Sequence, residues 1–314
     1  MKILATSTAP YLFTPPADVD VVPFDPKQPV PAEHLDADAA IVEGFSGPGI
    51  VQLAREAKKL RWIQTLAAGP DGVLAAGFGP EVTICNGRGL HSRTVAECAV
   101  TLALTGILRM PELLDAQRDR RWEHDQYGDW QLLRQPDRLT HVVGSEVLVW
   151  GFGAIGQQIA RILQTMGANV RGVANSAGER AGFEVVTEAD LPRLLPSTDI
   201  LVMVLPTHPT TDKALDADRI ALLPDHAWVV NVGRGSTVDE AALVEALNAG
   251  SIGGAALDVT AVEPYPTDGP LWSTPNTILT PHMAGGVADG SDELINENIR
   301  RFRAGDQLRN AIAR

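Results

Sequence analysis

The sequence has few cysteines and no long apolar run. Only Cys85 and Cys98 occur among its 314 residues, too few for a disulfide framework or a cysteine-rich zinc site, so we expect reduced thiols and no bound metal. No apolar run reaches the roughly 18 residues of a membrane span. Because the N-terminus turns polar and proline-rich within a few residues, it lacks the apolar stretch of a signal peptide, and we expect a cytoplasmic protein.

Basic residues are also scarce. There are 26 Lys and Arg against 39 Asp and Glu, which gives a formal net charge of -13 and an isoelectric point near 4.9. Such a surface repels phosphate backbones and anionic membranes, which argues against nucleic acids and membranes as partners. The composition is otherwise that of a globular protein, and the length allows about two domains of roughly 100–200 residues each.

The first third of the chain alternates short β-rich runs with helical stretches, which predicts a parallel sheet covered on both faces. The runs lie at residues 1–5, 39–42, 62–66 and 82–86. A long helical pattern follows from Ser92 to about Arg118, long enough to link two domains. The polar segment after it carries Trp122, Tyr127 and Trp130, and is either a locally packed excursion or an arm that reaches a partner subunit.

From Glu146 onward the strands become continuously apolar, which indicates burial on both faces. We expect strands at residues 147–150, 170–174, 200–205, 228–232, 254–258 and 277–280, separated by helices at 155–166, 188–195, 216–222 and 239–249. This β-α-β rhythm is typical of a doubly wound parallel sheet. One more long helix and a tail follow Gly285.

A glycine-rich turn leads from the first of these strands into its helix. Gly151, Gly153 and Gly156 have the spacing GxGxxG. The first glycine permits the tight turn, the second lets the backbone approach a pyrophosphate, and the third allows close packing of helix on strand. Three glycines also occur in purely structural turns, but strand, turn and helix arrive here in the order that dinucleotide binding requires.

The end of the next strand bears on the choice between NAD and NADP. Proteins that bind NAD place a carboxylate there for the adenosine ribose, whereas this sequence has Ala174, Asn175 and Ser176. Asn175 and Ser176 can donate hydrogen bonds to a 2′-phosphate, and Arg180 can pair with it. The sequence therefore favours NADP, with NAD as the alternative if the loop accepts either cofactor.

Three further segments place a polar residue near the end of an apolar strand, where open parallel sheets bind their ligands. They carry Arg234 between two glycines, Glu263 beyond a strand end, and His282 in the run TPH. Alone, each has a structural explanation as an ion pair, a loop charge or a hydrogen-bonded histidine. Together, after a dinucleotide turn, they supply what reduction of a keto acid requires. Arg234 would anchor the carboxylate and polarise the carbonyl, His282 would protonate the carbonyl oxygen, and Glu263 would hold the imidazole protonated.

The sequence resembles the D-isomer-specific 2-hydroxyacid dehydrogenases, and among them the glyoxylate/hydroxypyruvate reductases, over nearly its whole length. The residues that carry the resemblance are WIQ at 62–64, AGPD at 68–71, TVAE at 94–97, the glycine turn, LPT at 205–207, NVGRG at 231–235, LDV at 257–259 with EP at 263–264, and TPHMAG at 280–285.

The resemblance implies two doubly wound domains. A Rossmann-type cofactor domain, residues 93–284, would be inserted into a flavodoxin-like substrate domain, residues 1–92 plus 285–314. Backbone amides of Ala67, Ala68 and Gly69 would bind the substrate carboxylate together with Arg234, and Asp258 would hold the nicotinamide carboxamide. Members are typically homodimers joined through the cofactor domain. The other cofactor contacts implied are Thr94, Ala154, Ile155, Leu205, Pro206, Val232, Gly233, Ala284 and Gly285.

Two departures from the family pattern bear on specificity. Members that use NAD usually have Asp where Ala174 stands, which again favours NADP, and Thr260 stands where an aromatic residue is usual. We also expect no regulatory domain of the kind that some phosphoglycerate dehydrogenases carry, because too few residues follow His282. The leading hypothesis is therefore reduction of a small 2-keto acid such as glyoxylate or hydroxypyruvate.

Two alternatives stay open. A bulkier or phosphorylated hydroxy acid would need a basic pocket, which Arg88, His91 and Arg93 would supply. A corepressor-like protein that senses NAD(P) would keep the three catalytic residues without turnover. The acidic charge and the lack of an apparent apolar docking stretch argue against this second alternative.

Overall fold

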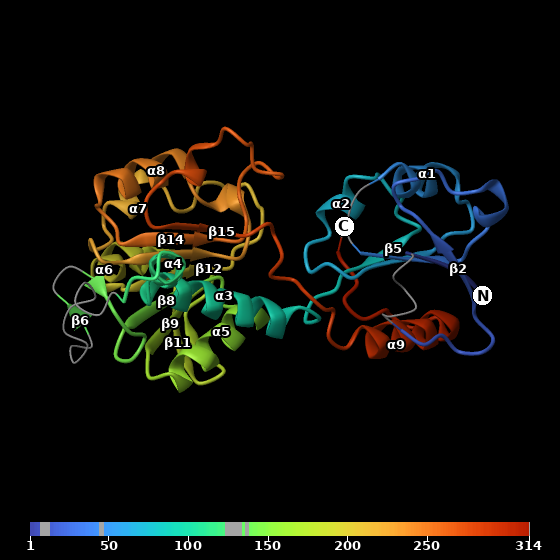
Figure 1. Cartoon of the computed structure of the whole chain (residues 1–314). Coiled ribbons are helices and arrows are strands. Elements are labelled where there is room, and N and C mark those ends of the chain that lie inside the picture. Colours follow the sequence, from blue (N-terminus) through green and yellow to red (C-terminus); the bar gives the residue numbers. More distant parts are fainter. Residues whose placement is uncertain (7–12, 44–46, 123–133, 136–137, 314) are drawn as a thin grey trace. The chain divides into compact units, whose positions relative to one another are not determined.

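The computed structural model describes residues 1–6, 13–43, 47–122, 134–135 and 138–313 (Figure 1). By internal contacts the chain divides into two compact units, Met1–Ser92 with Gly285–Arg314, and Arg93–Ala284. Tyr127 and Trp130, two of the aromatic residues of the expected arm, lie outside the described residues, while Trp122 is 94% exposed.

The smaller unit is built on a parallel five-stranded sheet with the strand order β2-β1-β3-β4-β5, which is the flavodoxin-like order. Its strands are β1 (Lys2–Thr6), β2 (Asp20–Phe24), β3 (Ala39–Val42), β4 (Trp62–Thr65) and β5 (Thr83–Cys85). Its helices are α1 (Pro48–Glu56), α2 (Asp71–Leu74) and α9 (Ser291–Ala304). Successive strand residues alternate between two cores: Ile3 packs on the side of α9, and Leu4 on the side of α1.

The larger unit contains an eight-stranded sheet with the order β10-β11-β9-β8-β12-β13-β14-β15, in which only β10 is antiparallel to its neighbour. Its strands are β8 (Glu146–Trp150), β9 (Asn169–Val173), β10 (Gly178–Arg180), β11 (Phe183–Val186), β12 (Ile200–Met203), β13 (Trp228–Asn231), β14 (Gly254–Leu257) and β15 (Thr277–Leu279). The parallel part follows the Rossmann order, with its reversal between β8 and β12. The predicted fold class is therefore confirmed.

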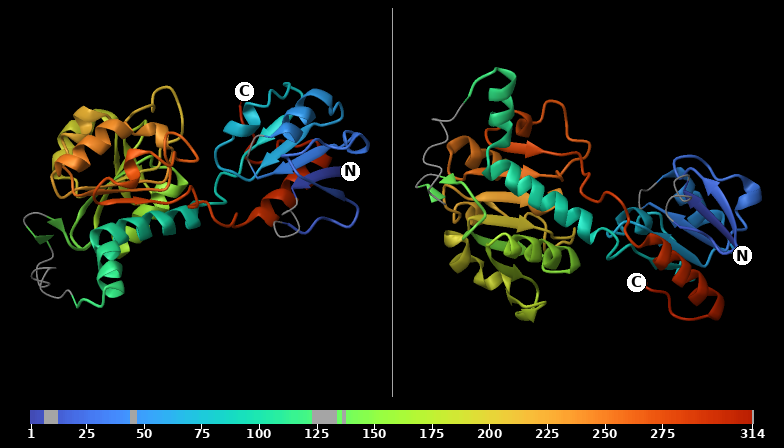
Figure 2. Two further views of the ribbon diagram at one scale, coloured as in Figure 1. Left: turned by 45° about the horizontal axis from the view of Figure 1, so that its top comes forward. Right: turned by 60° about the horizontal axis from the view of Figure 1, so that its bottom comes forward.

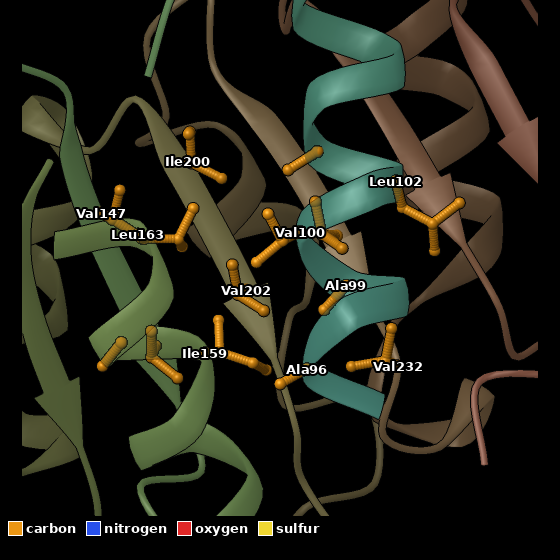
Figure 3. Close-up of a cluster of buried hydrophobic side chains, with 14 of the residues drawn as sticks. Ala96, Ala99, Val100, Leu102, Val147, Ile159, Leu163, Ile200, Val202 and Val232 are labelled. Carbon is orange, nitrogen blue, oxygen red and sulfur yellow. The ribbon is translucent and has the colours of Figure 1, made fainter. Parts of the chain in front are cut away.

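Helices cover both faces of the larger sheet (Figure 2). They are α3 (Ser92–Ile107), α4 (Met110–Arg118), α5 (Ala154–Thr165), α6 (Leu191–Leu194), α7 (Ala217–Ile220) and α8 (Glu240–Ala249). On one face, α3 and α5 pack their apolar residues onto Val147, Ile200 and Val202 (Figure 3). The opposite core includes Leu148, Leu201 and residues of α6, α7 and α8. The carboxyl ends of the strands are left for ligands.

The prediction of one helix from residue 92 to about 118 is wrong. α3 ends at Ile107, α4 begins at Met110, and the two are bent by 63°. Pro111 in the first turn of α4 has no N–H to donate and would clash with the Ile107 carbonyl in a continuous helix. Of the described helices, none alone is long and apolar enough to span a membrane. Only this bent pair, taken together, has the required length and apolar composition.

Candidate active site

The glycine turn between β8 and α5 has the shape that a pyrophosphate needs. Gly151 has φ 105°, and a Cβ on it would lie 2.5 Å from the carbonyl oxygen that follows β12. A Cβ on Gly156 would overlap the Gly151 carbonyl, whereas one on Gly153 would meet only open space. Among the described residues no side chain caps α5, so its first N–H groups, those of Ala154 and Ile155, remain for an anion. This turn fits a dinucleotide.

The turn after β9 has no carboxylate at the strand end. Ala174 is followed by the exposed Asn175 and Ser176. The β10–β11 hairpin follows, which the sequence did not predict, and the side chain of Arg180 at the end of β10 reaches back to Ser176. The Arg180 Nη2 donates to the backbone oxygen of Ser176 at 2.9 Å and to the Ser176 Oγ at 2.5 Å. Because strand side chains alternate, Glu179 points to the other face of β10. A guanidinium and a hydroxyl thus lie together beyond β9.

Arg234 lies in a turn after β13 that buried polar groups hold. The side chain of Asn231 is almost completely buried; its Oδ1 accepts the Gly233 N–H and its Nδ2 donates to the Arg234 carbonyl, both at 3.0 Å. The Thr237 hydroxyl donates to the same carbonyl at 2.6 Å. The Arg234 Nη1 donates to the Gly233 carbonyl at 2.8 Å. Backbone and guanidinium are therefore both held in place.

His282 and Glu263 form a hydrogen-bonded pair. His282 Nδ1 lies 2.6 Å from Glu263 Oε2, with the two side chains 45% and 38% exposed. The other carboxylate oxygen, Oε1, accepts the N–H of Thr260 at 3.1 Å. With Nδ1 turned to the carboxylate, Nε2 is the ring nitrogen available to a substrate. His282 has φ 53°, a conformation that costs free energy for a residue with a Cβ and persists only where neighbouring groups enforce it.

The buried carboxylate of Asp258 provides that enforcement. Its Oδ1 accepts the Thr280 hydroxyl at 2.6 Å and the Met283 N–H at 2.9 Å, and its Oδ2 accepts the Ala284 N–H at 2.9 Å. The Asp258 carbonyl accepts the N–H of His282 at 2.8 Å. Asp258 thus fixes the backbone on both sides of His282. A carboxylate offers about four acceptor positions, so the expected contact to the nicotinamide carboxamide stays a prediction.

A second carboxylate, that of Glu240, binds the loop that carries Glu263. Its Oε1 accepts the Ala261 N–H. Burial and the neighbouring Glu263 carboxylate raise its pKa, while the bond from Ala261 opposes the shift. Gly235 packs so closely on the same loop that a Cβ would overlap the backbone of Thr260. The loop that carries Glu263 is therefore fixed against both the Arg234 turn and the start of α8.

In the smaller unit, the loop after β4 has the form expected of an anion site. The carbonyls of Ala67 and Ala68 accept the Gly87 N–H at 2.8 Å and the Asn86 Nδ2 at 3.1 Å. Within the described part of the chain, the N–H groups of Ala68 and Gly69 meet no acceptor. Two adjacent backbone donors are thus available to a carboxylate. The third expected donor, the N–H of Ala67, is already bonded to the Thr65 hydroxyl at 3.2 Å.

The other predicted contacts stay predictions, and the structure gives only their places in the fold. A Cβ on Gly233 would lie 2.6 Å from the backbone N and O of Leu205, so the carboxyl ends of β12 and β13 meet there. Thr94 lies in the first turn of α3. Four further predicted contacts remain. Pro206 follows Leu205, Val232 precedes Gly233, Ala284 is the last residue of the larger unit, and Gly285 is the first residue of the second segment of the smaller unit.

Several residues of the site were missed from the sequence. Asn231, Thr237 and Thr280 are polar side chains that hold the turns around Arg234 and His282. A polar residue at the end of an apolar strand was their only signal. The cysteines take no part: burial raises the pKa of Cys85 to about 12, and burial, Asp258 and Glu97 raise that of Cys98 to about 11. No cluster suited to a metal ion occurs among the described side chains.

Known proteins are similar to this chain in sequence and in structure. The family model for the D-isomer specific 2-hydroxyacid dehydrogenase, NAD binding domain, matches residues 100–284, more than half of the chain. The glycerate dehydrogenase of Methylorubrum extorquens is 32% identical over 261 residues, which cover 78% of this chain and 77% of that protein. The D-3-phosphoglycerate dehydrogenase of Methanocaldococcus jannaschii is 28% identical over 304 residues, 94% of this chain but 55% of that protein, so the chain spans about half the length of this relative.

A solved structure is similar over both units. It is the NADPH-dependent glyoxylate/hydroxypyruvate reductase of Sinorhizobium meliloti in complex with NADP and sulfate, with a TM-score of 0.80 and 26% identity, covering 99% of this chain and 97% of that one. Fold, site and family model agree: the chain belongs to the D-isomer specific 2-hydroxyacid dehydrogenase family.

Proposed function

We propose that the protein reduces a small 2-keto acid of the glyoxylate or hydroxypyruvate class to the D-2-hydroxy acid, with NADPH preferred over NADH. The observation that carries the proposal is the 2.6 Å contact between His282 and Glu263, held at the carboxyl edge of a dinucleotide-binding sheet that also presents Arg234. The similarity to a glycerate dehydrogenase and to an NADPH-dependent glyoxylate/hydroxypyruvate reductase supports the substrate class.

Each residue then has a defined task. When bound, the nicotinamide supplies the hydride to the carbonyl carbon. Arg234 binds the substrate carboxylate through its planar fork and draws electron density toward the carbonyl oxygen. His282 donates its Nε2 proton to that oxygen, while Glu263 accepts the Nδ1–H, which orients the ring and stabilises its cationic form. The neutral ring regains its proton from water before the next turnover.

The preference for NADPH is tested by Ala174→Asp, which places a carboxylate at the end of β9. Because like charges repel strongly near a protein surface, the ratio of kcat/KM with NADPH to that with NADH should fall at least about tenfold. Ala174→Asn has nearly the same shape without the charge and should leave the ratio close to that of the unaltered enzyme. An unchanged ratio in the Asp variant would refute the proposed role of this loop.

The alternative of a phosphorylated substrate loses one of its three basic residues. Both ring nitrogens of His91 face backbone carbonyl oxygens, so the ring has no nitrogen left for a substrate phosphate. Arg88 and Arg93 remain, both exposed. Oxidation of NADPH and of NADH, followed by absorbance with glyoxylate, hydroxypyruvate, phosphohydroxypyruvate and a bulky aryl keto acid, separates the substrate classes. Chiral analysis of the product tests the D configuration.

The surface of the larger unit bears on assembly and on the corepressor-like alternative. The sequence showed no apolar docking stretch, but Leu108, Met110 and Leu114 are 38 to 43% exposed around the start of α4. We propose that a second copy of the chain covers them, giving a homodimer through the cofactor domain. Sedimentation equilibrium should then give a dimer, and Leu114→Glu should give a monomer. A monomeric unaltered protein would contradict this arrangement. For the corepressor-like alternative, the supporting result would be nucleotide binding without turnover of any keto acid.

A further inference from the structure

His91 is the last but one residue of the first segment of the smaller unit, next to the start of α3. Its two ring nitrogens face two backbone carbonyl oxygens. Nδ1 lies 2.7 Å from the oxygen of Gly285, and Nε2 lies 2.8 Å from the oxygen of Leu66. All three residues belong to the smaller unit, so these contacts are internal to it.

The Leu66 carbonyl begins the loop that offers its N–H groups to the substrate carboxylate. It is the first of three consecutive carbonyls held by the segment that follows β5, since those of Ala67 and Ala68 accept from Gly87 and Asn86. The approach is so close that a Cβ on Gly87 would overlap the Leu66 carbonyl. In a trans peptide the N–H points away from the preceding carbonyl, so the N–H groups of Ala68 and Gly69 point away from the segment after β5. The N–H of Ala67 instead donates to the Thr65 hydroxyl at 3.2 Å.

Gly285, the second partner of His91, begins the stretch by which the chain returns to the smaller unit. It directly follows Ala284, whose N–H is bound by the carboxylate of Asp258, and stands three residues after His282. His91 therefore connects the loop that begins at Leu66 with Gly285, three residues after the proposed proton donor His282.

The chemistry of the ring restricts how it makes both contacts. A neutral imidazole has one N–H and one lone pair, so it can donate to only one carbonyl, whereas the imidazolium ion donates from both nitrogens. Charge-assisted bonds of this kind are typically 2.7–2.9 Å long. We propose that His91 is a positioning residue that acts as an imidazolium ion and holds the Leu66–Gly285 link, so that Ala68 and Gly69 present their N–H groups to the substrate. The identity of that substrate rests on the proposed function; the link does not.

The test compares His91→Gln, which cannot donate to both carbonyls from two separated nitrogens, with Arg55→Gln, which removes a formal positive charge from the same unit at an exposed position. Hydrogen exchange of the free enzyme is measured by mass spectrometry over peptides spanning residues 62–69 and 284–290. We expect about tenfold faster exchange of the protected amides in His91→Gln, since a bond from a charged donor is lost, and no change in Arg55→Gln.

Steady-state kinetics provide the second readout. A contact to a carboxylate that does not change during the reaction contributes equally to the ground and transition states, so its loss raises KM and spares kcat. In His91→Gln, KM for glyoxylate should rise about tenfold, with kcat changed less than about twofold and the dissociation constant of NADPH unchanged. Nitrogen-15 shifts of labelled histidine, assigned with the same variant, should show both His91 nitrogens protonated in the unaltered enzyme.

Two results would overturn the inference. One is a singly protonated His91 ring in the unaltered protein, a measurement that requires no variant to fold. The other is exchange and KM in His91→Gln equal to those of Arg55→Gln, which would show that the change follows from the loss of a formal charge alone. If the unaltered protein turns over no keto acid, the proposed function fails, while exchange and the nitrogen shifts still decide the role of His91.

Discussion

Replacing His282 by Asn should lower kcat for keto acid reduction by about 10³-fold, within the range that general acid catalysis contributes. Asn retains a polar side chain of smaller size but cannot deliver a proton to the carbonyl oxygen. The backbone around the residue should persist, because Asp258 holds the flanking segment through the Thr280 hydroxyl and through N–H groups that the substitution leaves in place. Asn also tolerates a positive φ better than most residues.

The measurement combines single-turnover oxidation of NADPH with a fluorescence titration of NADPH binding. The dissociation constant should change less than about threefold, since the role proposed for His282 is at the reacting carbonyl and not at the pyrophosphate. His208→Asn is the matched control and should keep full activity, because His208 is an exposed histidine of the same unit whose Nδ1 contacts Thr210. A His282→Asn enzyme with kcat within about tenfold of the unaltered protein would show that another group donates the proton.

Both sheets could be predicted from the sequence because buried parallel strands carry a strong signal. The run at β12 is apolar throughout, since both of its faces are covered by helices. The GxGxxG turn added the order of strand, turn and helix, which indicates that ligands bind at the carboxyl ends of the strands of the larger sheet. The positions of Arg234 and His282 beyond apolar strands could also be predicted, whereas their catalytic roles were inferred only from their joint occurrence with Glu263 after a dinucleotide turn.

The missed elements lack that signal. β2 is an edge strand of the smaller sheet with mostly partial burial, and β10 is a mostly exposed edge strand of the larger sheet, so neither shows a continuous apolar run. The bend between α3 and α4 depends on Pro111, whose effect was outweighed by the apolar pattern on either side. The helix expected at residues 188–195 is a string of short turns, interrupted by Pro192 and Pro196.

The polar contacts that hold the site are the least predictable part. That Asn231 meets the Arg234 carbonyl depends on a turn geometry three residues long, and that Asp258 binds three donors depends on a loop more than twenty residues later in the chain. Sequence patterns report which residues are buried, but they do not report which donor a buried acceptor finds. The two contacts of His91 belong to this class as well.

Replacing Arg234 by Ala should lower kcat/KM for the keto acid by about 10³-fold, the loss expected for about two hydrogen bonds to a charged group. Both parameters should change, because the guanidinium anchors the carboxylate in the ground state and polarises the carbonyl most in the transition state. Arg234→Lys keeps the charge without the planar fork and should recover only part of the loss. Added guanidinium ion should partly restore turnover in the Ala variant and not in the unaltered enzyme.

A structural role for Arg234 makes a different prediction, which thermal unfolding measures. Its backbone carbonyl is held by Asn231 and Thr237, and truncation of the side chain leaves those bonds in place, so Tm should fall by only a few degrees. The side chain itself donates to the Gly233 carbonyl, a bond worth about 1 kcal/mol. If Arg234→Ala lost Tm but kept kcat/KM, the residue would serve the turn alone, and the substrate carboxylate would have to be recognised by the N–H groups of Ala68 and Gly69 without it.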